Sequence, residues 1–503
     1  MADVVVVGAG VAGLTAAALL AAAGRDVVLL EAHRRSGGCA GTFRRGAWTF
    51  DVGATQVAGL EPGGIHQRLF QHLGVPAPVA TPLDPACVVD LADGRAPVQL
   101  HRDPERWREE RRRQFPGSDR FWSLCQALHQ ANWAFATRDP VLPPRSWWDL
   151  SQLLQALGPA NLASGVLAAA TVSDLLHLCG CGADLRLRRF LDLQLRLYSQ
   201  EPCHRTAALY GATVLAMAQA PLGLWHLHGS MQSLSAALEA ALQRHGGRLL
   251  LRHRLQRLQP PKRQQAPWQL TVVQAEGATL RLEASDVVLT LPPQTLPDLL
   301  GEALPRGYRQ RLARLPEPSG ALVLYGAVNR ADLPPKVPGH LQLAWEQPGS
   351  LFVSVSQEGD GRAPAGEATV IASVFTPGQA WMNLAELHYQ ARKAEAMAAI
   401  LTGLEHLLGI PPERWRHAEL ATPRGWAGWT GRPGGIVGGL GQHPSRFGPF
   451  GLASRTPLPG LWLCGDSIHP GEGTAGVSIS ALMASRQLLA SRGQTLQLST
   501  PDR

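Results

Sequence analysis

The first fifty residues alternate between hydrophobic runs and glycine-rich turns. Residues 4–7 are four valines in succession, which predicts a parallel strand buried on both faces. Residues 14–23 have the composition of a helix, and residues 25–30 form the next apolar run. This order predicts a strand, a helix and a second strand, the βαβ unit of an α/β fold.

Three glycines with the spacing G-x-G-x-x-G separate the first strand from the helix: Gly8, Gly10 and Gly13. In this arrangement the first glycine permits a tight turn, the second lets a pyrophosphate approach the backbone, and the third lets the helix lie close to the strand. The start of the helix offers free N–H groups and a positive dipole end to phosphates. Glu31 ends the second strand, near the roughly twenty-residue separation expected of an acid that binds a ribose hydroxyl. These residues predict dinucleotide binding, and by themselves they fit NAD as well as FAD.

A second glycine cluster directly after Glu31 favours FAD. Residues 36–42 contain three further glycines, Gly37, Gly38 and Gly41, where a simple NAD domain would continue into another crossover helix. A glycine-rich loop lets the backbone run beside an extended cofactor, as the flavin end of FAD requires. Residues 50–54 then predict a short strand and a turn that return to the flavin.

The other end of the chain has the same combination of strand, glycine turn and helix. Residues 460–464 predict a strand that Gly465 and Asp466 follow. A glycine-rich turn occupies residues 469–476, and a helix is expected over residues 477–490. The positive end of that helix dipole would stabilise negative charge on a flavin ring that accepts a hydride.

The remaining pattern predicts a second lobe, because 503 residues exceed what one hydrophobic core usually holds. Strands are expected over residues 286–292, 319–328, 351–357 and 368–375. We assign the nucleotide-binding domain to residues 1–73, 225–298 and 420–503. The substrate lobe then comprises a largely helical part and a part with a sheet and helices, residues 74–224 and 299–419.

The glycine motifs, Glu31 and residues 51–53 resemble the N-terminal motifs of the amine-oxidase and phytoene-desaturase flavoprotein superfamily. Residues 460–478 resemble its C-terminal block. The resemblance implies an α/β, two-lobed FAD-dependent oxidoreductase with a Rossmann-like FAD domain and an α+β substrate domain. It also implies further contacts to FAD: Thr42, Leu255 beside the adenine, Gly465, Asp466 near the ribityl and pyrophosphate portion, and Gly473, Thr474 and Val477 beside the flavin ring.

Within the superfamily, residues 461–478 and 227–232 resemble the carotenoid C-3',4' desaturases of the cyanobacterial type. Those enzymes insert a double bond near one end of a carotenoid. The resemblance therefore implies a long apolar carotenoid substrate, hydride transfer to flavin N5 and an electron acceptor that the sequence does not identify. Two other functions stay open: a carotenoid cis–trans isomerase on the same FAD scaffold, and a non-catalytic lipid carrier of the same fold, which the Rab GDP-dissociation inhibitors exemplify.

Desaturation also releases a proton, and Glu472 is the candidate side chain to accept it. Glu472 lies in the glycine turn beside the expected flavin ring. His228 and His469 are weaker candidates. A glutamate in a glycine turn is also common as a surface residue or as an acid at the start of a helix, so both interpretations stay open.

The formal charge of +8 and the pI of about 9.4 fit either nucleic acid or an anionic membrane surface. We predict no nucleic-acid binding, because the chain contains no recognisable nucleic-acid module. The arginine-rich residues 106–113 lie in a part of the chain that also has five tryptophans: Trp107, Trp122, Trp133, Trp147 and Trp148. Tryptophan with arginine is typical of a membrane interface, although the same pattern fits a packed core and a solvated helix. The pattern, with the uncharged residues 206–225, leads us to expect a lobe that handles a long apolar molecule at a membrane surface.

The seven cysteines are scattered, and only Cys179 and Cys181 are close in sequence. Since no second pair completes a metal site, we predict reduced thiols and no metal. Glycines interrupt the uncharged residues 4–24 and 206–225, so neither run is expected to span a membrane. The expected location is the cytoplasm, with peripheral attachment to a membrane as an open alternative.

Overall fold

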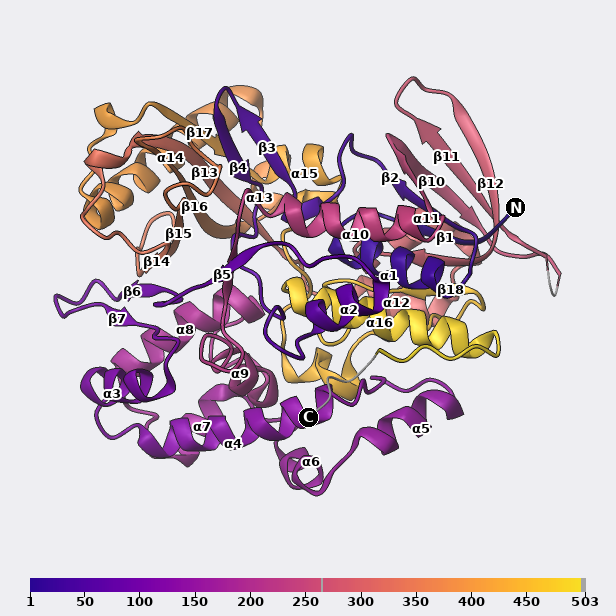
Figure 1. Ribbon diagram of the computed structural model, residues 1–503, viewed down its shortest axis with the longest axis horizontal. Helices are drawn as coiled ribbons and strands as arrows, with labels where there is room; N and C mark the ends of the chain where they lie inside the picture. The colour runs from indigo at the N-terminus through magenta and orange to yellow at the C-terminus, as the bar shows by residue number, and fades with distance from the viewer. Residues whose placement is uncertain (264–265, 499–503) are drawn as a thin grey trace.

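The computed structural model describes residues 1–263 and 266–498, which form two seven-stranded sheets and two small two-stranded ones. The strands of the first sheet lie at the right of Figure 1, and those of the second sheet lie at its upper left. A helical region extends below them. The mixed α/β fold predicted from the sequence is confirmed.

Three distant parts of the chain build the parallel portion of the first sheet. Its strands run in the order β18, β12, β1, β2 and β9. Their bounds are β1 (Ala2–Val7), β2 (Val27–Glu31), β9 (Arg248–Leu251), β12 (Thr279–Leu289) and β18 (Leu461–Leu463). Val4 and Val6 pack into the core on one face of this sheet, and Val5 and Val7 pack into the core on the other. Burial on both faces explains the continuous apolar run.

An antiparallel hairpin extends the first sheet. It consists of β10 (His253–Gln259) and β11 (Trp268–Gln274), and β11 pairs with the first half of β12. Strand β12 therefore begins before the predicted residues 286–292, because its polar first half pairs with this hairpin and only its apolar second half joins the parallel strands.

Three helices pack together on one face of the first sheet: α1 (Val11–Ala22), α10 (Gln232–Arg244) and α16 (Thr474–Ser491). Every residue of α1 from Val11 to Ala21 is buried. The small alanine and glycine residues of α1 allow neighbouring helices to approach this closely. The shorter α2 (Ile65–Leu73) lies beside them, as Figure 1 shows.

Two further helices cover the other face of the first sheet: α11 (Leu296–Leu300) and α12 (Arg306–Ala313). Leu304 and Leu312 pack in the core of that face. The packing on this face thus continues past residue 298, where the second segment of the predicted nucleotide-binding domain ends.

The second sheet runs in the order β17, β13, β16, β15, β14, β6 and β7. Its strands are β6 (Val88–Asp90), β7 (Val98–Gln99), β13 (Ser319–Asn329), β14 (His340–Leu343), β15 (Leu351–Val355), β16 (Glu367–Pro377) and β17 (His417–Ala421). Helix α14 (Glu386–Leu408) contributes to the core on one face of this sheet. The small elements beside it are α13 (Gln379–Met382), α15 (Pro423–Thr430) and the hairpin of β3 (Thr42–Arg45) and β4 (Trp48–Asp51).

The helical region has its own core, and its helices are α3 (Pro104–Gln114), α4 (Asp119–Ala136), α5 (Trp147–Ala156), α6 (Pro159–Ser164), α7 (Val172–Leu178), α8 (Leu185–Ser199) and α9 (Ala208–Val214). The expectation of a largely helical residue range 74–224 needs one correction. Residues 80–99 contain β6, β7 and β5 (Ala80–Pro82). Strands β6 and β7 extend the edge of the second sheet, while β5 pairs with β8 (Trp225–Leu227).

Two of the five tryptophans belong to the core of the helical region. Trp107 and Trp122 are each 4% exposed and pack edge to face, with the Arg111 guanidinium over both rings. The arginine run also forms ion pairs with acids of its own region, such as Arg113 with Glu110. For this pair of tryptophans, the packed-core interpretation therefore replaces the membrane-interface one.

None of the helices in the described residue ranges is both long enough and apolar enough to cross a bilayer. The uncharged residues 4–24 are β1 and α1, and residues 206–225 contain the short α9 and the start of β8. Over these same ranges the structure shows no cluster of potential metal ligands, and all seven cysteines are free thiols.

Candidate active site

A cavity of about 790 Å³ runs between the first sheet, the second sheet and the helical region. At one end, its wall is the backbone of both glycine-rich segments and of the C-terminal turn. At the other end, its wall consists of apolar side chains from the helical region and the second sheet. We call these two parts the groove and the chamber.

The three N-terminal glycines have different surroundings, which match the roles that their spacing predicts. Gly8 has a φ of +98°, and a Cβ atom there would lie 2.4 Å from Thr290 Oγ1. A Cβ atom on Gly13 would lie 1.8 Å from the carbonyl oxygen of Gly8, so only glycine lets α1 lie this close to the turn. Gly10 lines the groove, and no described atom lies within 4 Å of its Cβ position.

The second glycine cluster lies directly beside the first. The Gly37 N–H donates to the carbonyl oxygen of Ala9 at 2.7 Å, and Gly10 and Gly37 form a parallel β-bridge. Both Gly37 and Gly38 have positive φ values and line the groove. Two loops separated in sequence by α1 and β2 thus form one continuous backbone surface along the groove.

Glu31 lies at the end of β2, where the groove begins. Its Oε2 accepts a hydrogen bond from the Ala9 N–H at 2.7 Å, and its Oε1 accepts one from the His33 N–H at 2.8 Å. Burial raises the pKa of Glu31, and these backbone hydrogen bonds oppose the increase. The carboxyl group is therefore fixed against the first glycine turn, as expected of a group that binds a ribose hydroxyl.

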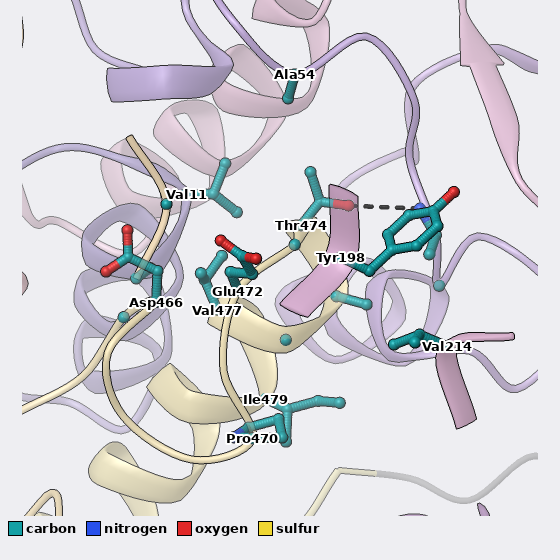
Figure 2. A pocket seen from close by; sticks show the side chains of 18 of the residues that line it. Val11, Ala54, Tyr198, Val214, Asp466, Pro470, Glu472, Thr474, Val477 and Ile479 are labelled. Carbon is teal, nitrogen blue, oxygen red and sulfur yellow. Dashed lines mark hydrogen bonds between the residues drawn. The ribbon is translucent and has the colours of Figure 1, made fainter. Parts of the chain in front are cut away.

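The C-terminal motif approaches the same groove from the opposite direction. Gly465 and Asp466 follow β18, and both line the groove together with Gly473, Thr474 and Val477. The Asp466 carboxylate forms an ion pair with Arg432 at 2.6 Å. Figure 2 shows Asp466, Glu472, Thr474 and Val477 around the start of α16.

Two helices begin at the groove, and neither N-terminus is capped by a side chain. Gly10 precedes α1 and Gly473 precedes α16, and neither helix has an acidic residue in its first turn. The two helices pack against each other, with Thr15 Oγ1 3.5 Å from Ser478 Oγ. The free N–H groups and positive dipole ends of both helices therefore point to one anion-binding region.

The sequence profile described as "Flavin containing amine oxidoreductase" matches residues 11–489. The chain belongs to this family. The groove fits its cofactor, FAD, because Gly10 leaves open space beside the uncapped start of α1, Glu31 lies at one end and α16 begins at the other. FAD is thus the cofactor of this chain, as predicted, whereas the contacts of individual residues to FAD stay predictions.

Curated proteins similar to this chain include a prolycopene isomerase and an all-trans-retinol 13,14-reductase. The prolycopene isomerase of Arabidopsis thaliana is 24% identical over 98% of this chain and 83% of its own length. The all-trans-retinol 13,14-reductase of Rattus norvegicus is 27% identical over 50% of this chain, and the match spans 42% of that enzyme.

Solved structures of the amine oxidase type have the same fold. Putrescine oxidase bound to putrescine has a TM-score of 0.61 and 19% identity, with 98% of this chain and 99% of that chain covered. Cyclohexylamine oxidase from Brevibacterium oxydans also has a TM-score of 0.61 and 19% identity, with 97% and 99% covered. At this identity the similarity supports the fold, and the substrate must be inferred from the cavity itself.

Three residues predicted to bind FAD do not line the cavity. Gly13 lies beneath the groove, where it permits the close packing described above. Thr42 is buried, and its hydroxyl donates to Asp51 Oδ1 at 3.1 Å. The Leu255 side chain packs into the core of the first sheet, because the alternation of β10 turns it away from the surface. All three residues therefore belong to the packed interior and not to the cavity wall.

Glu472 lies at the junction of the groove and the chamber. Its Oε2 accepts hydrogen bonds from the Gln200 side chain at 2.7 Å and from the Gly439 N–H at 3.3 Å. Its Oε1 is buried without a hydrogen-bond partner in the described chain. Burial is the main reason why the pKa of Glu472 rises to about 8. A carboxyl group in this state can exchange a proton near neutral pH.

The two histidine candidates differ in position. His228 is exposed and lies outside the cavity, so the structure does not support a role for it in proton transfer. His469 lines the cavity beside Phe447, and burial lowers its pKa to about 4. It is therefore neutral at physiological pH and a much weaker base than ordinary histidine.

Apolar side chains from several elements form the chamber: Trp133 and Phe135 of α4, Leu209 and Val214 of α9, Met217, and Phe352 of β15. Tyr198 of α8 also lines it. The lining residues extend to Leu153, Leu157 and Asn161, within and after α5. A long apolar molecule is the kind of ligand that such a lining suits.

Arg432 and Gln200 were not predicted from the sequence. Arg432 lies in the glycine-rich residues 431–439, which are a signal for close backbone approach that we did not use. Gln200 follows α8, and its contact with Glu472 joins positions 272 residues apart. Such contacts between distant helices and turns leave no local pattern in the sequence.

Proposed function

We propose that the protein is an FAD-dependent carotenoid desaturase that inserts a C-3',4' double bond near one end of its substrate. The observation that carries the proposal is the continuity of the cavity, which joins an FAD groove to an apolar chamber. A continuous cavity lets a carbon atom of an apolar substrate reach the reactive edge of the flavin. The resemblance of residues 461–478 to the C-3',4' desaturases supports the choice among reactions.

FAD, when bound, accepts the hydride that leaves one of two neighbouring carbon atoms. The neighbouring carbon atom loses a proton, and the carboxylate form of Glu472 accepts it at the junction of groove and chamber. The uncapped start of α16 stabilises negative charge nearby. The chamber positions the polyene and excludes water, and an external acceptor whose identity is open reoxidises the cofactor.

Product analysis with purified, FAD-loaded protein tests this proposal. The substrate is a hydroxylated monocyclic carotenoid, and a soluble quinone serves as electron acceptor. A desaturase gives a product with two fewer hydrogen atoms and an absorption maximum at longer wavelength, because the conjugated system is longer. Unchanged mass and unchanged absorption with a range of such carotenoids would overturn the proposal.

A carotenoid cis–trans isomerase is the second candidate. The alignment with the prolycopene isomerase of Arabidopsis thaliana over 98% of this chain favours it. Isomerisation is redox-neutral, so its product has the same mass as its substrate and needs no electron acceptor. The same assay, with FAD first reduced and a poly-cis carotenoid supplied, separates the two reactions.

We also propose that the edge formed by α5, α6 and the turn that follows touches a lipid bilayer. Its exposed apolar side chains are Trp147, Leu154, Leu162 and Val166, which are 59–87% exposed. The only charged residue in 146–173 is Asp149, which is buried and paired with Arg455. Large exposed apolar side chains on an uncharged edge suit the interior of a membrane better than water.

The position of this edge supports delivery of substrate from the bilayer, since Leu153, Leu157 and Asn161 of the same segment line the cavity. Sedimentation with liposomes tests the contact. Replacing Leu154, Leu162 and Val166 together by serine should reduce the bound fraction severalfold, while serine at the exposed Leu387 of α14 should leave it unchanged. Equal liposome binding by both variants would contradict this membrane contact.

A further inference from the structure

Arg432 lies where two of the backbone segments that line the cavity meet. Arg432 is 11% exposed and lines the groove. Its Nη2 donates to Asp466 Oδ2 at 2.6 Å, and its Nη1 donates to Cys39 Sγ at 3.8 Å. One side chain thus touches the second glycine cluster and the C-terminal motif at once.

The negative charges in the groove require a cation close to Asp466. Glu31 and Asp466 both line the groove, and a bound diphosphate adds two negative charges beside them. Asp466 is close to the start of α1, because the adjacent Gly465 has its Cβ position 3.9 Å from Ala12 Cβ. The start of α1 is also where the diphosphate of a dinucleotide is expected. Without a cation, the carboxylate and the diphosphate would repel each other.

The other arginines in the described lining are less suited to this role. Arg68 is already paired with both carboxylate oxygens of Asp139, at 3.1 and 2.7 Å. Among the described residues, Arg35 makes no polar contact with Asp466, and its Nη1 donates to the Thr42 carbonyl oxygen at 3.5 Å. Arg432 alone among these three lies against Asp466 and the second glycine cluster.

The backbone around Arg432 fixes its position. Arg432 follows Gly431, which has a φ of +67° and ends α15, and its N–H donates to Thr430 Oγ1 at 3.2 Å. Gly435 then packs so closely that a Cβ atom would lie 2.0 Å from the Pro423 carbonyl oxygen. A guanidinium group held in this way has five N–H donors, and the contacts to Asp466 and Cys39 use two of them.

We propose that Arg432 binds the diphosphate of FAD and bridges it to Asp466. The guanidinium group donates to a diphosphate oxygen atom through the N–H groups that Asp466 leaves free, opposite the N–H groups at the start of α1. The site therefore distinguishes ligands that carry the adenosine diphosphate from flavins that lack it.

Binding of three probes to the apoprotein tests this role. FAD and riboflavin are measured by quenching of flavin fluorescence, and ADP by calorimetry. Arg432→Ala should raise the Kd of FAD and of ADP by a similar factor, about 10- to 150-fold, as expected for loss of hydrogen bonds to a charged group. Riboflavin affinity should change less than twofold. Arg432→Lys should restore part of the ADP affinity, because lysine keeps the charge and loses the planar fork.

Two controls keep the test decisive. Arg314→Ala removes an exposed arginine at the end of α12 and should leave all three affinities unchanged. In the double variant Arg432→Ala, Asp466→Ala, the affinity for ADP should stay as low as in Arg432→Ala, because the cation that holds the diphosphate is absent. Recovery of ADP affinity in the double variant would mean that Arg432 only balances Asp466, and would overturn the proposal. Equal weakening of riboflavin and ADP by Arg432→Ala, or no weakening of ADP, would overturn it as well.

Discussion

The groove and the chamber form one cavity, yet they are built in opposite ways. The groove is a backbone surface, shaped by places where a Cβ atom would collide with the chain, as at Gly8 and Gly13. The chamber is a side-chain surface, shaped by the size of residues such as Met217 and Phe352. A backbone surface admits few substitutions, whereas a side-chain surface can be reshaped one residue at a time. The comparison suggests that the groove fixes the cofactor and the chamber selects the substrate.

The largest effect should come from adding one methyl group at Gly13, directly beneath the groove. In Gly13→Ala the new Cβ would overlap the Gly8 carbonyl oxygen, so the turn must shift. We expect the protein to lose FAD binding and about 1–3 kcal/mol of stability. Gly10→Ala is the matched control, because its Cβ meets no described atom and its φ of −70° suits alanine. The Gly10→Ala apoprotein should stay folded, and its affinity for FAD should fall at least tenfold. Thermal unfolding of the apoprotein and flavin quenching measure the two effects, and similar stability of both variants would refute the packing argument.

A smaller effect is expected where the two parts of the cavity meet. Glu472→Gln keeps the shape of the side chain and removes its ability to take up a proton, so the turnover number should fall about 10²- to 10⁴-fold with FAD affinity unchanged. Steady-state kinetics and flavin titration of the same preparation separate the two. If turnover persists at the level of the unaltered protein, Glu472 plays no part in the proton transfer.

The pH dependence sharpens the same assignment. Burial raises the pKa of Glu472 to about 8, so the carboxyl group is mostly protonated at pH 6 and mostly ionised at pH 9. Because the ionised form is the proton acceptor, kcat/KM should rise about tenfold per pH unit below pH 8 and level off above it. The profile of Glu472→Gln should lack this rise. A rise of the same size in the variant would assign the titration to another group.

The smallest effect should arise within the chamber. Val214→Trp places a large ring in the wall that α9 contributes (Figure 2) and should raise KM for a long carotenoid about tenfold, a loss of roughly 1.4 kcal/mol. FAD affinity should stay the same, and Val214→Ala should have little effect on KM. An unchanged KM in a tryptophan variant that folds normally would show that the substrate does not use this part of the chamber.

The groove could be predicted from the sequence far better than the chamber. Glycine spacing, the valine strand and Glu31 are local patterns with a direct geometric meaning, and the fold brings most of the expected residues to the groove. Leu255 and Thr42 could not be assigned in this way, because the face that a strand residue presents depends on its neighbours in the sheet. The chamber lining comes from α4, α8, α9 and β15, whose packing against one another has no short sequence pattern.

Polar contacts between distant residues were equally hard to predict from the sequence. Arg432 lies 34 positions from Asp466, and Gln200 lies 272 positions from Glu472. The buried state of Glu472 depends on both the turn and α8, so the rise in its pKa could not be inferred from the glycine turn alone. Trp107 and Trp147 illustrate the same limit, since one is buried and the other is 87% exposed within a single tryptophan-rich segment.

The contact of Thr15 with Ser478 joins positions 463 residues apart and has a consequence for how the protein is made. Helix α1 is synthesised well before α16, the helix that completes its environment. At about 5–20 residues per second, the interval between the two is roughly 25–90 s. During that time the nascent chain has only one side of its cofactor site. Flavin loading must therefore follow the synthesis of α16, and a chain released before residue 474 would leave the apolar surface of α1 exposed to aggregation or proteolysis.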